Sequence, residues 1–328
     1  MAQMNAATAK PFLATDIGGT HARLALVRAG ADGRIEILDH HKYLCADFTG
    51  LAAIVEDFLS SRGDVDDAAI GCTGMRRGDT LVSRNLPWPV SLPEIRALGI
   101  DRLATINDFV AVAHASQCMG PDDGVPLTPQ TGSPQSGHEP GPVLVVGPGT
   151  GFGAALRVPV SEDWRVLPSE AGQMSMAPGT ERELQVLAWL LREAPYVRAE
   201  QAVSGPGLLL LYRSLCALDG ATPRQGAPAD VAAAAERGDD AQAAEAVAIF
   251  FAQFGSLLAD LVMATGATRV FVAGGIVTKI RGLLERSDFV PRFLNKGVMR
   301  QALERVPIRL IDHPHKGVIG AANWYLRR

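Results

Sequence analysis

The sequence lacks the features that mark several classes of protein. Its four cysteines, Cys45, Cys72, Cys118 and Cys216, are widely spaced and form no C-x-x-C pair. This spacing is typical of reduced, mostly buried thiols and argues against a cysteine zinc motif or a disulfide framework. No long run of lysine and arginine is present and the formal net charge is −4. We therefore expect no nucleic-acid partner and no binding to an anionic membrane surface.

Signals for export or membrane insertion are also missing. The N-terminus has no basic region followed by an apolar core, so we expect no signal peptide. The most apolar long segment, residues 248–265, is interrupted by Gln253 and Asp260, which indicates a buried helix and not a membrane span. With neither signal, the cytoplasm is the expected compartment.

What is present is an ordinary globular composition, with 47% hydrophobic and 20% charged residues. The length of 328 residues suggests two domains and allows a sizeable core. Up to Cys118 the pattern predicts three strands, helix, strand, helix, strand and helix, with a polar loop at 73–88. This alternation favours an α/β layer with a mixed sheet.

Residues 12–27 read as a strand, a tight glycine turn and a second strand. Asp16 stands where the first strand ends, and Gly18, Gly19 and Thr20 follow it. A glycine backbone can approach an anion closely because it has no Cβ. A carboxylate beside such a turn can hold hydrated Mg²⁺, which takes further oxygens from phosphates. The stretch predicts a nucleotide-phosphate loop, although a hairpin without a ligand would have the same pattern.

A second stretch, residues 143–158, repeats the pattern of the first. Laid on residues 12–27 without gaps, it again shows a strand, a glycine turn and an exit strand, and Gly149 falls on Gly18. We interpret this as an internal repeat, with coincidence between two hairpins as the alternative. Two domains that each begin with such a hairpin could grip one nucleotide in a cleft between them. The Gly- and Pro-rich residues 120–142 are the expected loop at the boundary.

The second half of the chain alternates loops, helices and short strands. Residues 164–178 are predicted as a loop with strand character, 231–235 as part of an exposed helix and 240–264 as a long buried helix. Strands are expected at 269–277, where a glycine turn ends the segment, and at 306–311, followed by a terminal helix at 317–326.

Two common nucleotide motifs are absent or incomplete. There is no G-x-x-x-x-G-K-[ST] phosphate loop. Residues 149–154 loosely match the dinucleotide fingerprint, but residues 155–160 continue as a strand and Pro159 disfavours the helix that the fingerprint needs.

The Asn107-Asp108 pair lies between an apolar strand and a helix, at the sheet edge where ligands of α/β proteins usually bind. Asp108 there could act as a general base. The alternative is that the pair only caps the helix, a task for which both residue types are suited. Glu170 and Glu200, taken singly, are typical of solvated carboxylates.

Five motifs, in order along most of the chain, resemble the bacterial glucokinases of the proteobacterial type. They are Asp16-Ile-Gly-Gly-Thr20 with Ala22-Arg-Leu-Ala-Leu26, Ile106-Asn-Asp-Phe109, Gly147-Pro-Gly-Thr-Gly-Phe-Gly153, Glu200-Gln-Ala-Val-Ser-Gly-Pro-Gly-Leu208 and Phe271-Val-Ala-Gly-Gly-Ile-Val277. The repressor-related sugar kinases, in contrast, carry a cysteine-rich zinc motif that is missing here. The resemblance implies a fold of two actin-like (ribonuclease H-like) α/β domains with a ligand cleft between them. Residues 1–118 with 312–328 would form the smaller domain and 119–311 the larger.

The resemblance also implies an activity, namely ATP-dependent phosphorylation of the 6-hydroxyl of a hexose, with Mg²⁺ as cofactor and a small-molecule sugar as substrate. Asp108 matches the catalytic base. Asn107, Glu170, Gln173 and Glu200 match sugar-binding positions. The nucleotide-binding positions are Asp16, which would also be the metal ligand, Gly18, Gly19, Thr20, Gly149, Thr150, Gly151, Gly274 and Gly275. The family commonly forms homodimers, so a homodimer is a possible assembly.

The sugar side departs from the family pattern. Gln173 stands where the family has histidine, and Ala171 replaces a glycine, which would disfavour a positive φ there. A misplaced polar partner can cost a sugar site orders of magnitude in turnover. Three hypotheses follow: a glucokinase with altered kinetics, a kinase for another hexose, or a sugar-binding or regulatory protein of the same fold with weak or no catalysis. The presence of Asp108, Glu170 and Glu200 favours an enzyme.

Overall fold

The computed structural model describes residues 10–30, 34–83, 85–118, 124–128, 141–161 and 163–328. The chain forms two compact units, one of residues 1–122 with 313–328 and one of residues 123–312. Each unit is described by itself below. Most of the loop expected at 120–142 lies outside the described residues. The expected first domain boundary, between residues 118 and 119, lies at the edge of a described range.

The first unit is built on a five-stranded mixed sheet with the order β3-β2-β1-β4-β8. Strands β1 (Phe12–Ile17), β2 (His21–Ala29) and β3 (Ile35–Leu44) form an antiparallel meander. Strands β4 (Asp67–Cys72) and β8 (Arg102–Asn107) follow, and both run parallel to β1. The predicted glycine hairpin therefore opens this unit.

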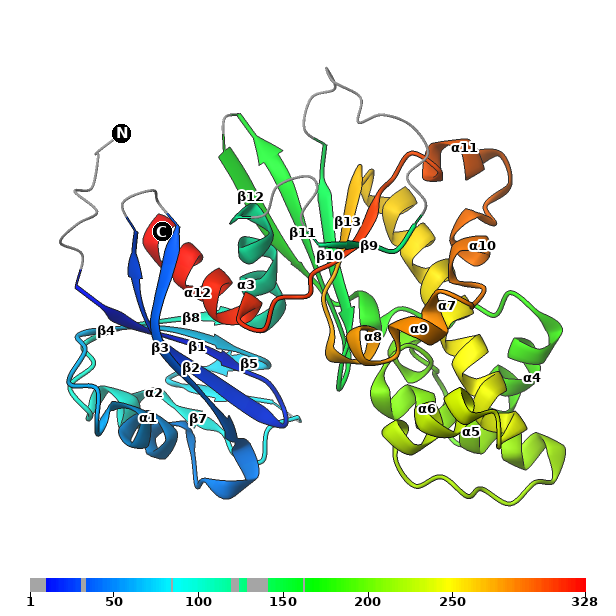
Figure 1. The fold of residues 1–328 in the computed structure, drawn as a ribbon, viewed down its shortest axis with the longest axis horizontal. Helices are drawn as coiled ribbons and strands as arrows, with labels where there is room; N and C mark the ends of the chain where they lie inside the picture. Colours follow the sequence, from blue (N-terminus) through cyan, green and yellow to red (C-terminus); the bar gives the residue numbers. More distant parts are fainter. Residues whose placement is uncertain (1–9, 31–33, 84, 119–123, 129–140, 162) are drawn as a thin grey trace. The chain divides into compact units, whose positions relative to one another are not determined.

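Helices cover both faces of this sheet (Figure 1). On one face α1 (Leu51–Leu59) and α2 (Leu92–Arg96) pack on side chains such as Leu13 and Ile70. On the other face α3 (Asp108–Ala115) and the C-terminal α12 (Lys316–Arg327) pack on alternate residues such as Ala14 and Ala69. Successive strand residues point to opposite sides of the sheet. Because helices cover both sides, both faces of the sheet are apolar.

Residues 73–88 were predicted as a polar loop, and this is wrong. They contain β5 (Met75–Arg77) and β6 (Thr80–Val82), which pair with β7 (Val90–Ser91) in a small three-stranded sheet. All three residues of β5 are exposed, whereas Leu81 of β6 and Val90 of β7 are buried. Strands this short do not show the apolar alternation by which strands are recognised.

The second unit repeats the topology of the first. Its sheet has the order β12-β11-β10-β13-β14-β9, and the first five strands correspond in direction and order to β3-β2-β1-β4-β8. The strands are β9 (Val125–Pro126), β10 (Val143–Pro148), β11 (Phe152–Val160), β12 (Asp163–Ser169), β13 (Arg269–Val272) and β14 (Ile308–Leu310). The internal repeat is thus present at the level of the sheet, with β9 as an added edge strand.

The gap-free overlay of the two hairpins needs one correction. In the first hairpin Ile17 pairs with Ala22, whereas in the second Pro148 pairs with Phe152. The second turn is therefore one residue shorter, and the two exit strands are out of step by one position in the overlay. Because a one-residue shift turns each side chain to the other face of a sheet, residues 152–158 match their partners only after this gap.

Helices of the second unit surround the long helix α7 (Ala241–Thr265), whose side chains are largely buried. The helix is long and apolar enough to cross a membrane, but 78% of its most apolar window is buried inside the protein, as in the core helix of a globular unit. The other helices are α4 (Glu181–Leu190), α5 (Gly205–Asp219), α6 (Pro228–Arg237), α8 (Gly275–Lys279), α9 (Arg281–Leu284), α10 (Phe289–Leu294) and α11 (Arg300–Leu303). Short 3₁₀ turns span Cys45–Asp47, Ser116–Cys118, Ala171–Gln173, Ala199–Gln201 and Gly297–Met299.

Two further expectations for this unit were partly wrong. The helix near 231–235 is not simply exposed, because Val231 and Ala234 are fully buried. The strand expected at 269–277 ends at Val272, and residues from Gly275 onward form α8.

A buried ion pair ties three helices of the second unit together. Glu183 on α4 lies 2.6 Å from the Arg292 guanidinium on α10, and the exposed fractions of the two side chains are 2% and 12%. Gln253 on α7 donates a hydrogen bond to the same carboxylate at 2.6 Å. Removal of one partner would leave an uncompensated charge in the core.

We therefore expect Arg292→Met to lower the free energy of unfolding of this unit by about 3–5 kcal/mol, measured by urea titration. The matched control is Arg237→Met, which removes the exposed pair between Arg237 and Asp239 and should cost no more than about 1 kcal/mol. Equal losses in the two variants would contradict the role assigned to the buried pair.

Candidate active site

Three parallel strands of the first unit end side by side. In the register of the sheet, Ile17 of β1 pairs with Cys72 of β4, and Cys72 pairs with Asn107 of β8. Asp16 and Asp108 therefore lie at the same carboxyl edge, where α/β sheets bind their ligands. Burial, and after it the negative charges of Asp108 and Asp16, raise the pKa of the Cys72 thiol to about 12.

Asn107 and Asp108 form the start of α3. The Asn107 side chain accepts hydrogen bonds from the backbone N–H groups of Phe109 at 3.0 Å and Val110 at 3.2 Å, so it is the N-cap of the helix. Asp108 is the first helical residue, and its carboxylate also accepts from Phe109 N–H, at 3.0 Å. The capping interpretation holds for Asn107, and it fixes the backbone that carries Asp108.

The first glycine turn is held in place by its surroundings. Gly18 N–H donates to the carbonyl of His21 at 3.0 Å, and Cys45 N–H donates to the carbonyl of Thr20 at 3.0 Å. A Cβ on Gly19 would lie 2.6 Å from the carbonyl oxygen of Asn85. Such a contact is too short for any real side chain, so the close packing of the turn requires glycine at this position.

Asp16 lies beside this turn and under the first turn of α12. Its carboxylate is 3.3 Å from the Arg23 guanidinium, and one fifth of its side chain is exposed. A Cβ on Gly317 would lie 2.3 Å from Asp16 Cγ, so the helix can approach only because residue 317 is glycine. Burial raises the pKa of Asp16, and the positive charges of Arg23 and Lys316 offset this only in part.

Within the described ranges, no three His, Cys, Asp or Glu side chains gather into a metal site. Asp16 supplies a single carboxylate. This donor set suits Mg²⁺, which is commonly bound through one or two carboxylates while substrate phosphates and water complete its shell.

The second glycine turn belongs to the second unit and is joined to the start of α5. Gly149 N–H donates to the carbonyl of Gly151 at 2.7 Å, and Gly205 N–H donates to the carbonyl of Gly149 at 2.9 Å. Thr150 at the tip of the turn is exposed. Gly274 and Gly275 lie where β13 passes into α8, with Gly274 as the N-cap.

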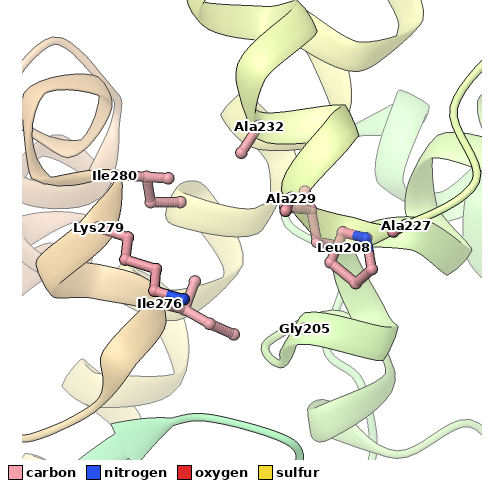
Figure 2. Close-up of a pocket in the computed structure, with 9 residues that line it drawn as sticks. Gly205, Leu208, Ala227, Ala229, Ala232, Ile276, Lys279 and Ile280 are labelled. Carbon is pink, nitrogen blue, oxygen red and sulfur yellow. The ribbon is translucent and has the colours of Figure 1, made fainter.

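A cavity of about 260 Å³ adjoins this turn. Figure 2 shows side chains of α8 and the residue after it on one side, facing side chains of α5 and α6 on the other. Gly205 contributes both to the cavity and to the hydrogen bond with Gly149. The other main lining residues, nearly all apolar, are Leu208, Pro228, Ala229, Ala232, Ile276, Lys279 and Ile280.

Binding roles for the cavity residues were not predicted from the sequence, apart from the neighbouring Gly274-Gly275 turn. Gly205, Leu208 and Ile276 lie within two of the recognised motifs, but the cavity itself is formed by three helices that are separated in the sequence. The contribution of α6 was missed because the helix near 231–235 was interpreted as exposed.

Gln173 and Glu200 come together although their segments are separate in the sequence. Ser175 pairs with Arg198 in an isolated antiparallel bridge, which places the two segments alongside each other. The Gln173 Nε2 group then donates to Glu200 Oε1 at 3.0 Å. Arg198 Nη1 lies 3.3 Å from the same oxygen. The sequence-based prediction had not included Arg198.

Glu170 precedes these residues at the start of the 3₁₀ turn Ala171–Gln173, and its side chain is exposed. The strain expected at Ala171 is absent, because Ser161 is the one non-glycine residue with positive φ among those described. Ala171 is instead buried in the turn.

A sequence model of the glucokinase family matches residues 13–328. The chain belongs to the glucokinase family. A relative named glucokinase-like protein, from Xylella fastidiosa strain Temecula1, is 42% identical over 97% of this chain and 95% of its own length. The glucokinase of Nitrobacter hamburgensis is 36% identical over 94% of this chain and 95% of its own.

A solved structure shows the same fold. The glucokinase from an Antarctic psychrotroph superposes with a TM-score of 0.82 at 32% identity, and the match covers 98% of this chain and all of the other. The family predicted from the five motifs is confirmed, as is the α/β fold of actin-like type.

The charge at Asp16 makes a testable contribution to the stability of this glucokinase-family chain. Because the pKa of Asp16 is raised by burial in the folded state, its contribution is favourable below the pKa of the unfolded chain and is lost as pH rises through the folded pKa. We therefore expect Asp16→Asn to unfold at a temperature no lower than the wild type at pH 7, with the difference vanishing in acid.

Asp67 provides the matched control with the opposite sign. Hydrogen bonds from Arg102 hold the pKa of Asp67 below its usual value, so its contribution is present at neutral pH and lost as pH falls. Asp67→Asn should lose about 1 kcal/mol at pH 7. A loss of the same size for Asp16→Asn in calorimetric melts would contradict the account.

Proposed function

We propose that the protein is an ATP-dependent hexose kinase that transfers a phosphoryl group to the 6-hydroxyl of glucose. The observation that carries the proposal is the position of Asp108 at the carboxyl edge of the first sheet, directly after Asn107, which is level with Ile17 at the start of the glycine turn. A carboxylate fixed at the start of a helix beside a phosphate-type turn fits a base for a hydroxyl nucleophile. Membership of the glucokinase family supports the same reaction and the use of ATP.

Each unit offers groups that suit a part of the nucleotide. The cavity beside Gly205 has apolar walls from Leu208, Ile276 and Ile280, which suit the faces of an adenine ring. The glycine turns at 18–20 and 149–151 offer backbone N–H groups, with the hydroxyls of Thr20 and Thr150, to phosphate oxygens. Asp16 would hold Mg²⁺, which when bound neutralises phosphate charge.

Each unit also carries polar side chains that suit sugar hydroxyl groups. Glu170 and Glu200 can each accept hydrogen bonds from hydroxyl groups, and Gln173 can donate or accept. Asn107 would use its amide nitrogen, because its oxygen is engaged in capping α3. Polyol recognition of this kind depends on the position of each partner, since an unmatched buried polar group is costly.

In the proposed reaction Asp108 accepts the proton of the 6-hydroxyl as that oxygen bonds to the γ-phosphorus. The bond from phosphorus to the oxygen bridging the β- and γ-phosphates breaks, which yields ADP and the sugar 6-phosphate. Positioning and charge stabilisation contribute most of the rate acceleration in such transfers. Asp108 is therefore required in its ionised form.

A second function remains in view because of Gln173. This residue replaces the histidine of the family pattern, and the relative from Xylella fastidiosa is named glucokinase-like protein. The alternatives are a kinase for another hexose and a sugar-binding or regulatory protein with weak or no catalysis.

We also propose that the two compact units act as separate domains. A cytoplasmic location, a homodimeric state and the lack of nucleic-acid or membrane partners remain predictions.

The proposal is tested by measuring ADP release with Mg²⁺-ATP and a panel of glucose, mannose, fructose and galactose. Turnover of glucose with the highest kcat/KM supports it. Preferential turnover of another hexose supports a kinase for that hexose. Sugar binding without turnover of any hexose supports a sugar-binding or regulatory protein.

Loss of the base gives a direct prediction. Asp108→Asn keeps the shape of the side chain and the Asn107 cap, but it cannot accept the proton, so kcat should fall by about 10²–10⁴. The control is Asp101→Asn, which alters an exposed carboxylate just before β8, the strand that leads to Asp108. This variant should leave kcat unchanged. Equal kcat values for the wild type and Asp108→Asn would contradict the assignment.

Filling the cavity tests the nucleotide site separately. Ala229→Trp places a ring in the space assigned to adenine and should raise the KM for ATP about tenfold or more, with the glucose KM unchanged. Ala233→Trp on the same helix is exposed and lies outside the cavity lining, so it should leave both KM values unchanged. The same result for both variants would rule out this cavity as the adenine site.

A further inference from the structure

Arg198 contacts two residues of the predicted sugar site. One is Gln173, which departs from the family pattern, and the other is Glu200, which matches it. Its Nη1 group lies 3.3 Å from Glu200 Oε1 and donates to Gln173 Oε1 at 3.4 Å. Gln173 closes the set by donating from Nε2 to the same Glu200 oxygen at 3.0 Å. The three side chains thus form a closed ring of contacts.

The ring is anchored in the backbone around it. Arg198 N–H donates to Gln201 Oε1 at 2.9 Å, and the Arg198 Nε group lies 3.4 Å from that oxygen. Tyr196 donates its hydroxyl to the carbonyl oxygen of Gln173. The guanidinium is therefore fixed at its base, and it still keeps 37% of its side chain exposed.

The contacts limit what Glu200 can offer to a sugar. A carboxylate has about four acceptor positions. On Glu200, Oε1 accepts from Gln173 Nε2 at 3.0 Å and lies 3.3 Å from Arg198 Nη1, whereas Oε2 accepts a longer hydrogen bond, from Phe152 N–H at 3.4 Å. Glu200 is thus oriented by its neighbours, and Oε2 is the oxygen more open to a hydroxyl group.

We propose that Arg198 is a positioning and specificity-determining residue of the sugar site, which acts with Gln173 in place of the histidine found in the family. The inference rests on the proposed function, because it takes Gln173 and Glu200 as sugar ligands. Arg198 orients the Glu200 carboxylate and fixes the Gln173 amide, so that Glu200 presents Oε2 to the sugar.

The pairing of arginine with glutamine has a chemical reason. The amide of Gln173 can donate to Glu200 and accept from Arg198 at the same time. A protonated histidine in its place would set a second cation against the guanidinium, and a neutral imidazole would have to meet both partners from a rigid ring. Arg198 and a histidine at position 173 are therefore poorly compatible.

The first test compares steady-state kinetics of Arg198→Met, Arg198→Lys and the control Arg192→Met, which alters an exposed arginine outside the ring. Arg198→Met should raise the glucose KM about tenfold, because charged hydrogen bonds contribute on this scale, with kcat and the ATP KM within about twofold. Arg198→Lys keeps the positive charge but loses the planar guanidinium, so its glucose KM should lie between those of the wild type and Arg198→Met. Arg192→Met should match the wild type.

The second test is a double-mutant cycle with Gln173→His. Alone, Gln173→His should raise the glucose KM about tenfold. In the Arg198→Met background the same change should have a clearly smaller effect, because the conflicting cation is gone. Additive effects in the cycle, or a glucose KM for Arg198→Met within about twofold of the wild type, would overturn the proposal.

Calorimetric titration of glucose without ATP separates this inference from the proposed function. If the wild type binds glucose but turns over no hexose, the proposed kinase fails, and a weaker Kd in Arg198→Met still supports the role of Arg198. If the wild type turns over glucose and Arg198→Met has unchanged KM and Kd, only the inference fails. If no hexose is bound or turned over, both fail.

Discussion

The parallel pairing of β1, β4 and β8 is the constraint on which the candidate site of the first unit depends. It brings Ile17, Cys72 and Asn107 level, and so it carries Asp16 and Asp108, far apart in the chain, to one edge of the sheet. The arrangement has a cost, because burial raises the pKa of Asp16 and disfavours its charge. The approach of α12 through Gly317 keeps this carboxylate in place and links the end of the chain to its first strand. The ionised form of Asp16 therefore contributes less stability in the folded protein than an exposed carboxylate would.

The second unit uses the same sheet topology for a different task. Where β1 has Asp16 paired with Arg23, β10 has Gly147 paired with Gly153, so the strand that leads into the second turn carries no carboxylate at the matching position. The carboxylate beside this turn is that of Glu200, which accepts a hydrogen bond from Phe152 N–H at 3.4 Å. The cavity and the side chains proposed to bind the sugar are built on helices and turns around this sheet. The division agrees with a reaction that needs one metal-binding oxygen and two sets of N–H groups for phosphates. A duplicated fold has in this way become two chemically distinct halves.

The sequence was sufficient for features that depend on local pattern. The two glycine hairpins, the strand leading to Asn107-Asp108 and the buried helix α7 follow from hydrophobic spacing and turn residues. The sheet at 75–91 was missed because its strands are short. Arg198 and the cavity beside Gly205 were missed for another reason: their partners come from distant segments, and no spacing along the chain encodes that contact. The capping role of Asn107 was recognised as an alternative, but only the hydrogen bonds to Phe109 and Val110 decide it.

The central claim is that a phosphoryl group is transferred from ATP to the 6-hydroxyl of glucose with Asp108 as base. The most direct measurement is a ¹H–³¹P correlation NMR spectrum of glucose, ATP and Mg²⁺ incubated with the protein. The account predicts a phosphomonoester whose phosphorus couples to the two protons on carbon 6, formed at the expense of ATP and greatly slowed in Asp108→Asn. Release of inorganic phosphate without a sugar phosphate, a product phosphorylated at another carbon, or equal rates in the two proteins would contradict it.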